Sequence, residues 1–232
     1  MKDTAVRAMF ETIAGGYDFQ NSFLSLGTDI YWRRALAASL RLPEQSLVLD
    51  VAIGTAEVAV DICRRHPGAR VVGIDFSPAM LAVGKRKIQA RNLESRIEPM
   101  AGDARWLPIR SASVDAVTIA FGIRNIQEKQ VVLQEFHRVL KPGGQLFIMD
   151  FSYPDGHLLG GLYRFYANHI LPPIGNWLSG TDYAYSYLAD SVDKFPPDQE
   201  FLKIIAHAGF GGLGVRKLTF GIAKIFYGLK EA

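Results

Sequence analysis

The sequence predicts an α/β protein with a doubly wound, Rossmann-like sheet, and two observations predict it. Short apolar runs alternate with segments of helical period through the middle of the chain, which favours parallel strands linked by helices. Residues 48–59, VLDVAIGTAEVA, also describe a strand that passes through a small-residue turn into a helix, and residues 71–77, VVGIDFS, describe a second strand ending in an acid. Such a unit typically binds a nucleoside at the carboxyl ends of its strands.

The elements are predicted in chain order from these patterns. Residues 1–42 predict two or three helices, the last beginning near Thr28 and ending before Pro43. The strands of the core are expected at Leu47 to Ala52, Arg70 to Asp75, Ile97 to Ala101, Val114 to Ala120 and Gln145 to Asp150. Helices are expected at Ala56 to His66, Pro78 to Asn92 and Glu128 to Leu140. A last helix, Pro197 to Ala208, precedes two strands, Gly214 to Phe220 and Ile222 to Leu229.

Local signals set two of the helix ends. Ser77 is a typical N-cap residue and Pro78 suits the first helical turn, so a helix is expected to begin there. Residues 141–144, KPGG, supply a basic last turn, a proline and two glycines, so the preceding helix is expected to end before them.

A chain of 232 residues is long enough to bury one substantial core. We expect a single domain with an N-terminal helical lid (1–42), a cofactor-binding core (43–154), a substrate-covering insert (155–197) and a C-terminal helix with strands (198–232). The net charge of +3 is small and its basic residues are dispersed, which argues against nucleic acid as a partner.

The compartment and the metal content are predicted from absences. Cys63 is the single cysteine, so an internal disulfide is excluded and a reducing compartment is favoured. Charges interrupt the first 18 residues, so no signal peptide is expected there. The five histidines lack ligand spacing, so no metal site is expected. The protein is expected in the cytoplasm, with peripheral membrane contact left open.

Acidic residues around the first turn indicate the nucleoside. A dinucleotide fold needs three glycines, spaced G-x-G-x-x-G, for its pyrophosphate, and this turn offers only Gly54. Asp50 and Glu57 flank the turn and would attract a ligand that carries an ammonium and a sulfonium. Asp75, which ends the second strand, would accept hydrogen bonds from ribose hydroxyls. These residues favour S-adenosylmethionine, and an ordinary strand–turn–helix without a ligand is the alternative.

Six blocks of the sequence resemble a known family. The chain is similar to class I S-adenosylmethionine-dependent methyltransferases and, more closely, to the ubiquinone/menaquinone biosynthesis C-methyltransferases. The matching blocks are FETIAGGYDFQNSFLSLGTDIYWRR from Phe10, VLDVAIGTAEVA from Val48, GIDFSPAML from Gly73, IAFGIRN from Ile119, FHRVLKPGG from Phe136 and YSYLADSVDKFP from Tyr185. The resemblance implies C-methylation of a polyprenylated quinol, demethylmenaquinol to menaquinol in first place. It leaves open the same chemistry on 2-methoxy-6-polyprenyl-1,4-benzoquinol.

The resemblance also implies the cofactor contacts. Thr55 would lie against the methionine moiety beside Gly54, Asp75 would hold the ribose and Phe76 would cover the adenine face. The edge of the adenine would meet Asp103 and Ala104, although Asp103 as a plain loop-capping residue is the alternative.

One departure from the family pattern affects the turn. The chain reads GTAE where relatives usually read G-T-G-D, so an alanine occupies position 56. We expect a negative φ at Ala56 and a Cβ that narrows the clearance for the cofactor.

The block IAFGIRN places a cation and an amide at the end of a strand. Methylation of a quinol ring needs its phenolate, and a phenol ionises near pH 10. Arg124 could stabilise that phenolate and Asn125 could orient it. A structural ion pair with a neighbouring helix is the alternative for Arg124. Tyr17 of the lid is expected to close the site, with simple packing as its alternative.

Residues 156–182 are unusually aromatic and apolar for a connection. We interpret them as a roof over the hydrophobic substrate that also meets the bilayer surface. A subdomain core or a homodimer face would explain the same composition. Two further classes stay open for the whole chain: a scaffold subunit that binds no cofactor, and an NAD-dependent oxidoreductase, which the missing glycines disfavour.

Overall fold

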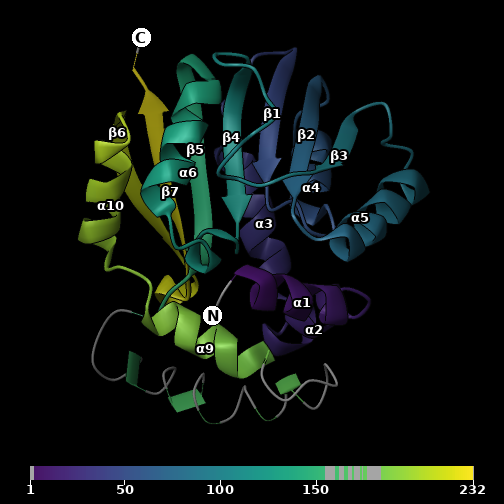
Figure 1. Cartoon of the computed structure of the whole chain (residues 1–232), viewed down its shortest axis with the longest axis vertical. Coiled ribbons are helices and arrows are strands. Elements are labelled where there is room, and N and C mark those ends of the chain that lie inside the picture. Colours follow the sequence, from purple (N-terminus) through teal and green to yellow (C-terminus); the bar gives the residue numbers. More distant parts are fainter. Residues whose placement is uncertain are drawn as a thin grey trace.

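The computed structural model describes residues 3–154 and 184–231, with positions 160, 161, 165, 166, 169, 173, 175 and 176 between them. This part of the chain forms a seven-stranded sheet of order β3-β2-β1-β4-β5-β7-β6 (Figure 1). β7 pairs antiparallel with both β5 and β6, and the other neighbouring strands of the sheet pair in parallel. The strands are β1 Ser46–Val51, β2 Ala69–Asp75, β3 Ile97–Ala101, β4 Val114–Ala120, β5 Leu140–Phe151, β6 Phe210–Leu218 and β7 Ala223–Lys230. The predicted α/β class is therefore confirmed.

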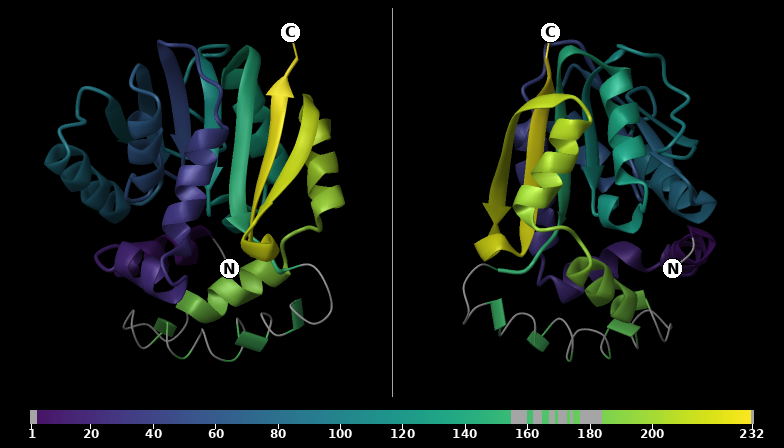
Figure 2. Two further views of the ribbon diagram at one scale, coloured as in Figure 1. Left: turned by 180° about the vertical axis from the view of Figure 1, so that it is seen from behind. Right: turned by 60° about the vertical axis from the view of Figure 1, so that its left-hand side comes forward.

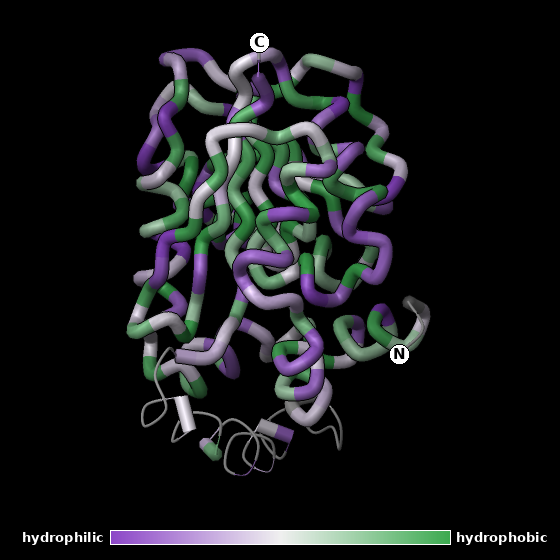
Figure 3. Tube along the Cα trace, turned by 90° about the vertical axis from the view of Figure 1, so that its left-hand side faces the viewer, coloured by the Kyte–Doolittle hydropathy of each residue, from purple (hydrophilic) through white to green (hydrophobic). Residues whose placement is uncertain are grey.

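Helices cover both faces of this sheet (Figure 2). One core cluster joins the sheet to α3 (Thr28–Ser39), α4 (Glu57–Arg65) and α5 (Pro78–Ala90). The other joins it to α6 (Lys129–Val139) and α10 (Asp198–His207). Because successive strand residues point to opposite faces, Val48 lies in the first cluster and Leu49 in the second. Figure 3 shows the resulting hydrophobic centre.

Most element ends agree with the sequence patterns. The Ser77 hydroxyl accepts a hydrogen bond from the backbone N–H of Met80 at 3.4 Å, and Pro78 opens α5. Two strands start earlier than expected. β5 begins at Leu140 because Leu140 pairs with Val114 of β4, after which KPGG bulges, with Gly143 at φ 76°, and pairing resumes at Gln145. β6 begins at Phe210 across a register shift between Gly211 and Gly214.

Two short lid helices and one later helix lie beyond the carboxyl ends of the parallel strands (Figure 1). They are α1 (Asp3–Ile13), α2 (Tyr17–Leu24) and α9 (Ala184–Asp193). The last of these falls inside the insert of residues 155–197, for which the sequence predicts helical structure. Residues 156–182, which are predicted to form a roof over the substrate, lie almost entirely outside the described residues, and so do Leu158, Leu162 and Ile170 within them. Within the described part, no helix is long and apolar enough to cross a membrane.

Candidate functional site

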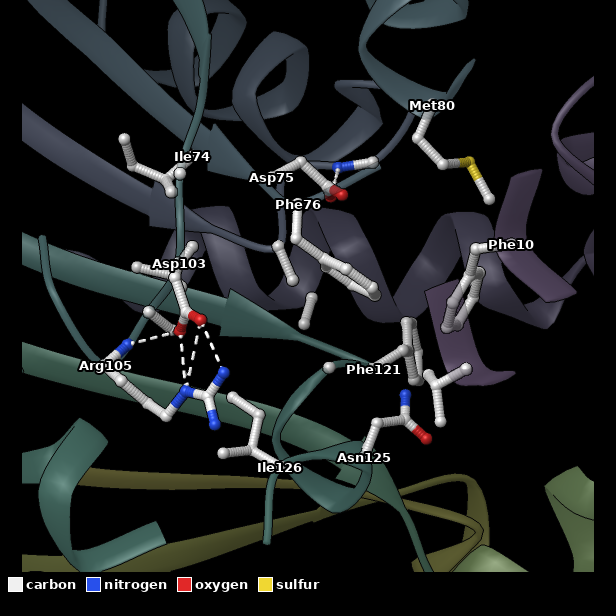
Figure 4. Close-up of a pocket in the computed structure, with 18 of the residues that line it drawn as sticks. Phe10, Ile74, Asp75, Phe76, Met80, Asp103, Arg105, Phe121, Asn125 and Ile126 are labelled. Atoms are coloured by element: carbon white, nitrogen blue, oxygen red, sulfur yellow. Dashed lines mark hydrogen bonds and ion pairs between the residues drawn. The ribbon is translucent and has the colours of Figure 1, made fainter. Parts of the chain in front are cut away.

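A pocket lies where the strand ends meet the lid, and it brings most of the predicted site together (Figure 4). Its walls come from the turn after β1, the ends of β2 and β4, the loop after β3, and helices α1 and α2. The predicted residues that line it are Gly54, Asp75, Phe76, Asp103, Ala104, Tyr17 and Asn125. Thr55 and Arg124 do not line it.

Asp75 occupies the centre of the cofactor side of this pocket. Its Oδ2 accepts a hydrogen bond from the backbone N–H of Gly54 at 2.8 Å, and its Oδ1 accepts one from Ser77 at 2.9 Å. Burial raises the pKa of Asp75, and these hydrogen bonds counteract that rise. Each carboxylate oxygen has two lone pairs, so both can still accept a hydrogen bond from a diol. With the flat apolar wall of Ile74 and Phe76 beside it, the site fits an adenosine group.

The turn after β1 is held in an unusual backbone conformation. Ala52, Gly54 and Ala56 have φ values of 54°, 56° and 67°, all in the left-handed region. The expectation of a negative φ at Ala56 is therefore wrong. Its Cβ is fully buried and approaches Gly84 of α5, instead of the pocket. This packing offsets the strain of a left-handed alanine, about 1–2 kcal/mol. Because Ala56 does not line the pocket, its Cβ does not narrow the space for the cofactor, contrary to the expectation.

Arg105 occupies both oxygens of Asp103. Its guanidinium donates to Oδ1 at 3.0 Å and to Oδ2 at 2.6 Å, while another of its nitrogens reaches Glu128 at 2.7 Å. These bonds hold the pKa of Asp103 below its usual range. Both carboxylates line the pocket with Arg105, so an adenine amino group must share Asp103 with this arginine. The sequence patterns did not single out Arg105, because its pairing depends on how the loop folds.

Arg124 is paired with a carboxylate at the end of β5. Its Nη1 lies 2.7 Å from Oδ1 of Asp150 and 2.5 Å from the carbonyl oxygen of Phe121, and its backbone N–H donates to Oδ2 of Asp150. The two side chains are 7% and 0% exposed. The structure thus contains an ion pair of the kind given as the alternative role for Arg124, although its partner Asp150 lies on strand β5 and not on a helix. Its predicted contact with a phenolate stays a prediction.

Tyr17 and Asn125 both line the pocket. Burial raises the pKa of the Tyr17 phenol, while the charge of Arg124 acts in the opposite direction. The charges of Asp18 and Asp150 raise the pKa of Tyr17, so Asp150 opposes the effect of its partner Arg124 on this phenol. The Oδ1 atom of Asn125 is buried, and no donor among the described residues reaches it. An orphaned acceptor of this kind is costly, so a ligand hydroxyl would fit there.

The two acids that flank the turn do not present free charge. Glu57 pairs with Lys87 at 2.9 Å and with Arg91 at 3.1 Å. Asp50 is buried beneath the turn, where its Oδ1 accepts the hydroxyl of Thr118 at 2.6 Å. Burial raises the pKa of Asp50 to about 7. The predicted attraction of Asp50 and Glu57 for a cationic ligand is therefore weakened. The carboxylates that line the pocket are Asp75, Asp103 and Glu128.

Asp50 predicts a pH-dependent stability. Its folded pKa of about 7 exceeds the ordinary aspartate pKa of 3.8, so the folded state holds the extra proton and loses stability as pH rises from about 4 to 7. Asp50→Asn removes the ionisation cost, roughly 4 kcal/mol at pH 8, but buries an amide group that lacks a partner, at roughly 1–3 kcal/mol. We expect the variant to be more stable by roughly 1–3 kcal/mol at pH 8, and equally stable or less stable by up to about 2 kcal/mol at pH 4.5, where the ionisation cost is only about 1 kcal/mol. Urea unfolding at both pH values measures this, and equal stability at pH 8 would contradict it.

Known sequences match this chain along nearly its whole length. The family model described as the ubiE/COQ5 methyltransferase family matches residues 1–230. The chain is 44% identical to the ubiquinone/menaquinone biosynthesis C-methyltransferase UbiE of Syntrophotalea carbinolica, with 97% of this chain and 94% of that protein covered. It is also 44% identical to the demethylmenaquinone methyltransferase of Deinococcus radiodurans, over 99% of this chain and 94% of that protein.

Solved structures are similar in fold. A possible histamine N-methyltransferase from Thermotoga maritima superposes with a TM-score of 0.68 at 18% identity, covering 97% of this chain and 99% of that one. A methyltransferase from Aquifex aeolicus, described as dependent on S-adenosylmethionine, gives 0.60 at 19% identity over 85% and 89% of the two chains. At such identities these matches support the Rossmann-like class I architecture alone. The sequence matches confirm the resemblance inferred from the six blocks, and the chain belongs to the ubiE/COQ5 methyltransferase family.

Proposed function

We propose that this protein transfers a methyl group from S-adenosylmethionine to a ring carbon of a polyprenylated quinol, with demethylmenaquinol as the first substrate. The observation that carries the proposal is one pocket that combines a ribose-type carboxylate, Asp75, with two substrate-type polar groups, Tyr17 and Asn125. Membership of a methyltransferase family supports the reaction class. Relatives named demethylmenaquinone methyltransferase in Deinococcus, Thermus and Porphyromonas support the menaquinone substrate.

The chain's own residues divide between the two ligands. Asp75 holds the ribose, Phe76 covers the adenine, and Asp103 with Ala104 meets its edge. Gly54 lets the turn approach the cofactor, and Thr55 belongs to the same turn although its hydroxyl is turned toward the lid. In the reaction a C–S bond of the cofactor breaks, a C–C bond forms on the ring, S-adenosylhomocysteine leaves, and the methylated ring carbon loses its proton to solvent.

The quinol side depends on charge. Asn125 offers its unpaired Oδ1 to a quinol hydroxyl, and Tyr17 closes the pocket from the lid. Arg124 acts to lower the cost of ionising a phenol in the pocket, against burial and the charge of Asp150, both of which raise the pKa of Tyr17. Because Arg124 stays protonated, it stabilises the phenolate and does not remove the proton. Exclusion of water by the lid strengthens this effect.

A direct assay separates the two substrates and the scaffold alternative. The protein is incubated with labelled S-adenosylmethionine and, in parallel, with demethylmenaquinol or 2-methoxy-6-polyprenyl-1,4-benzoquinol, each in detergent. We expect label in the first quinol, and in the second at a lower kcat/KM. Label in the second alone would replace the substrate. Calorimetry that detects no S-adenosylmethionine binding would favour a scaffold, and binding of NADH instead would favour an oxidoreductase.

We also propose that the protein acts at the cytoplasmic face of a membrane, where a polyprenylated substrate resides. The exposed apolar side chains of the α2–α3 region lie at the same end of the molecule as the pocket. This α2–α3 patch comprises Phe19, Phe23, Leu26, Ile30 and Tyr31. Leu26 is 91% exposed, and apolar side chains of this kind insert into the headgroup region of bilayers.

Vesicle binding tests the α2–α3 patch. We expect the triple variant Phe19→Ser, Phe23→Ser and Leu26→Ser to lower co-sedimentation with lipid vesicles at least fivefold, because each side chain loses an interfacial burial of about 1.5 kcal/mol or more. Leu229→Ser is the matched control, since Leu229 is exposed near the end of β7, at the opposite end of the sheet. Equal binding by the triple variant and the wild type would exclude this surface.

A further inference from the structure

The residue that follows Tyr17 links the lid to the cofactor turn. Asp18, in the first turn of α2, accepts a hydrogen bond at Oδ1 from the hydroxyl of Thr55, at 2.6 Å. Its Oδ2 forms an ion pair with Lys87 of α5. One carboxylate thus contacts both the loop that holds the cofactor and the helix that follows the ribose-binding strand.

The ion pair extends into a wider network. Lys87 also pairs with Glu57 at 2.9 Å, and Arg91 pairs with Glu57 at 3.1 Å. Burial of Glu57 is outweighed by these two cations, which lower its pKa. One network of ion pairs therefore joins three parts of the structure: the cofactor turn together with α4, the helix α5, and the lid. The lid contributes Asp18 to this network.

Apart from the Asp18 contacts, the lid meets the body of the protein mainly through apolar packing, in which Phe10, Tyr17 and Leu24 lie in one cluster with side chains of α5 and α9. The same cluster joins Met9, Ile13 and Ala14 to Met80 of α5, while Phe19 and Phe23 of α2 face solvent. A segment with a small buried surface opens at low free-energy cost. Loss of the Asp18 contacts would therefore shift the lid toward its open state.

We infer that Asp18 is a positioning residue, which couples the cofactor turn to the lid and holds Tyr17 in the pocket. The effect of Asp18 on the kinetics of quinol methylation rests on the proposed function. Thr55 is the link, because its hydroxyl belongs to the cofactor turn and donates to the lid. Any ligand that orders the turn then favours the docked lid, and by thermodynamic reciprocity the docked lid favours that ligand by the same factor.

Hydrogen exchange tests the coupling without the quinol. We expect S-adenosylmethionine to slow amide exchange in residues 3–24 of the wild type, and this protection to fall at least tenfold in Asp18→Ala. Lys87→Met should give a smaller loss, because the bond between Asp18 and Thr55 remains. Glu11→Gln is the matched control: it removes an exposed lid ion pair with Arg7 and should leave exchange unchanged. Protection in Asp18→Ala within twofold of the wild type would overturn the coupling.

Kinetics test the positioning of Tyr17. The apparent KM rises in inverse proportion to the fraction of molecules whose lid is docked, so Asp18→Ala should raise the quinol KM about tenfold and change kcat less than threefold. A Thr55→Val and Asp18→Ala double variant should lose little more than Asp18→Ala alone, because Asp18→Ala already removes the bond to Thr55. Additive losses, or an unchanged KM, would refute the inference. If the wild type methylates no quinol yet shows the exchange effect, the proposed function fails and the coupling stands.

Discussion

Asp75→Asn should weaken S-adenosylmethionine binding about 100-fold. The substitution keeps the size of the side chain but removes the charge that two ribose hydroxyls would bond to. A hydrogen bond to a charged group contributes roughly 1.5–3 kcal/mol, and a total loss of about 3 kcal/mol corresponds to a 100-fold change in Kd. The new amide also faces the N–H of Gly54 or Ser77, which now donates to Asp75. Isothermal titration calorimetry measures the effect directly.

A matched control separates this loss from general destabilisation. Asp115 also accepts a backbone hydrogen bond, from Leu47 at 2.8 Å, and pairs with Lys141 at 2.7 Å. It does not line the pocket. Asp115→Asn should therefore lower the melting temperature without changing cofactor affinity. A Kd for Asp75→Asn within threefold of the wild type would show that another group holds the ribose.

The strands, most helix ends and the position of the pocket could be predicted from the sequence. Period-2 and period-3.6 patterns, caps and glycine signals act over a few residues, so each is readable locally. The ends of parallel strands share one edge of a sheet, and for this reason Gly54, Asp75 and Asn125 were expected at one site and line one pocket. Their roles in binding and catalysis stay predictions.

Partners across the fold could not be predicted. Arg124 and Asp150 are 26 positions apart, Asp18 and Thr55 are 37 apart, and Lys87 lies 69 positions from Asp18. Nothing in a local pattern states which carboxylate a cation will meet. The left-handed backbone at Ala56 was missed for a different reason: intrinsic propensity disfavours it, and burial of its Cβ against α5 outweighs that preference. Propensity is a weak guide where tertiary packing decides.

Arg124→Ala should lower both stability and the methylation rate, and the two losses have different causes. Removing the guanidinium leaves Asp150 buried without its cation, which costs roughly 3–5 kcal/mol of unfolding free energy. It also removes the positive field from the pocket, so the quinol hydroxyl ionises less readily. Loss of one preorganised stabilising group typically lowers kcat by about 100-fold. The cofactor Kd should change less than threefold, because Arg124 does not line the pocket.

A double variant distinguishes these causes. Arg124→Ala with Asp150→Asn has no unpaired buried charge, so urea unfolding should recover most of the lost stability. The rate should stay low, because the phenolate still lacks its cation. The acidic limb of the kcat profile should move to higher pH, since a phenol without a nearby cation ionises closer to its ordinary pKa of about 10, and the deficit should shrink at about pH 9 for the same reason. Recovery of the full rate together with stability would reduce Arg124 to an ion-pair residue, and the phenolate would then depend on Asn125 and Tyr17.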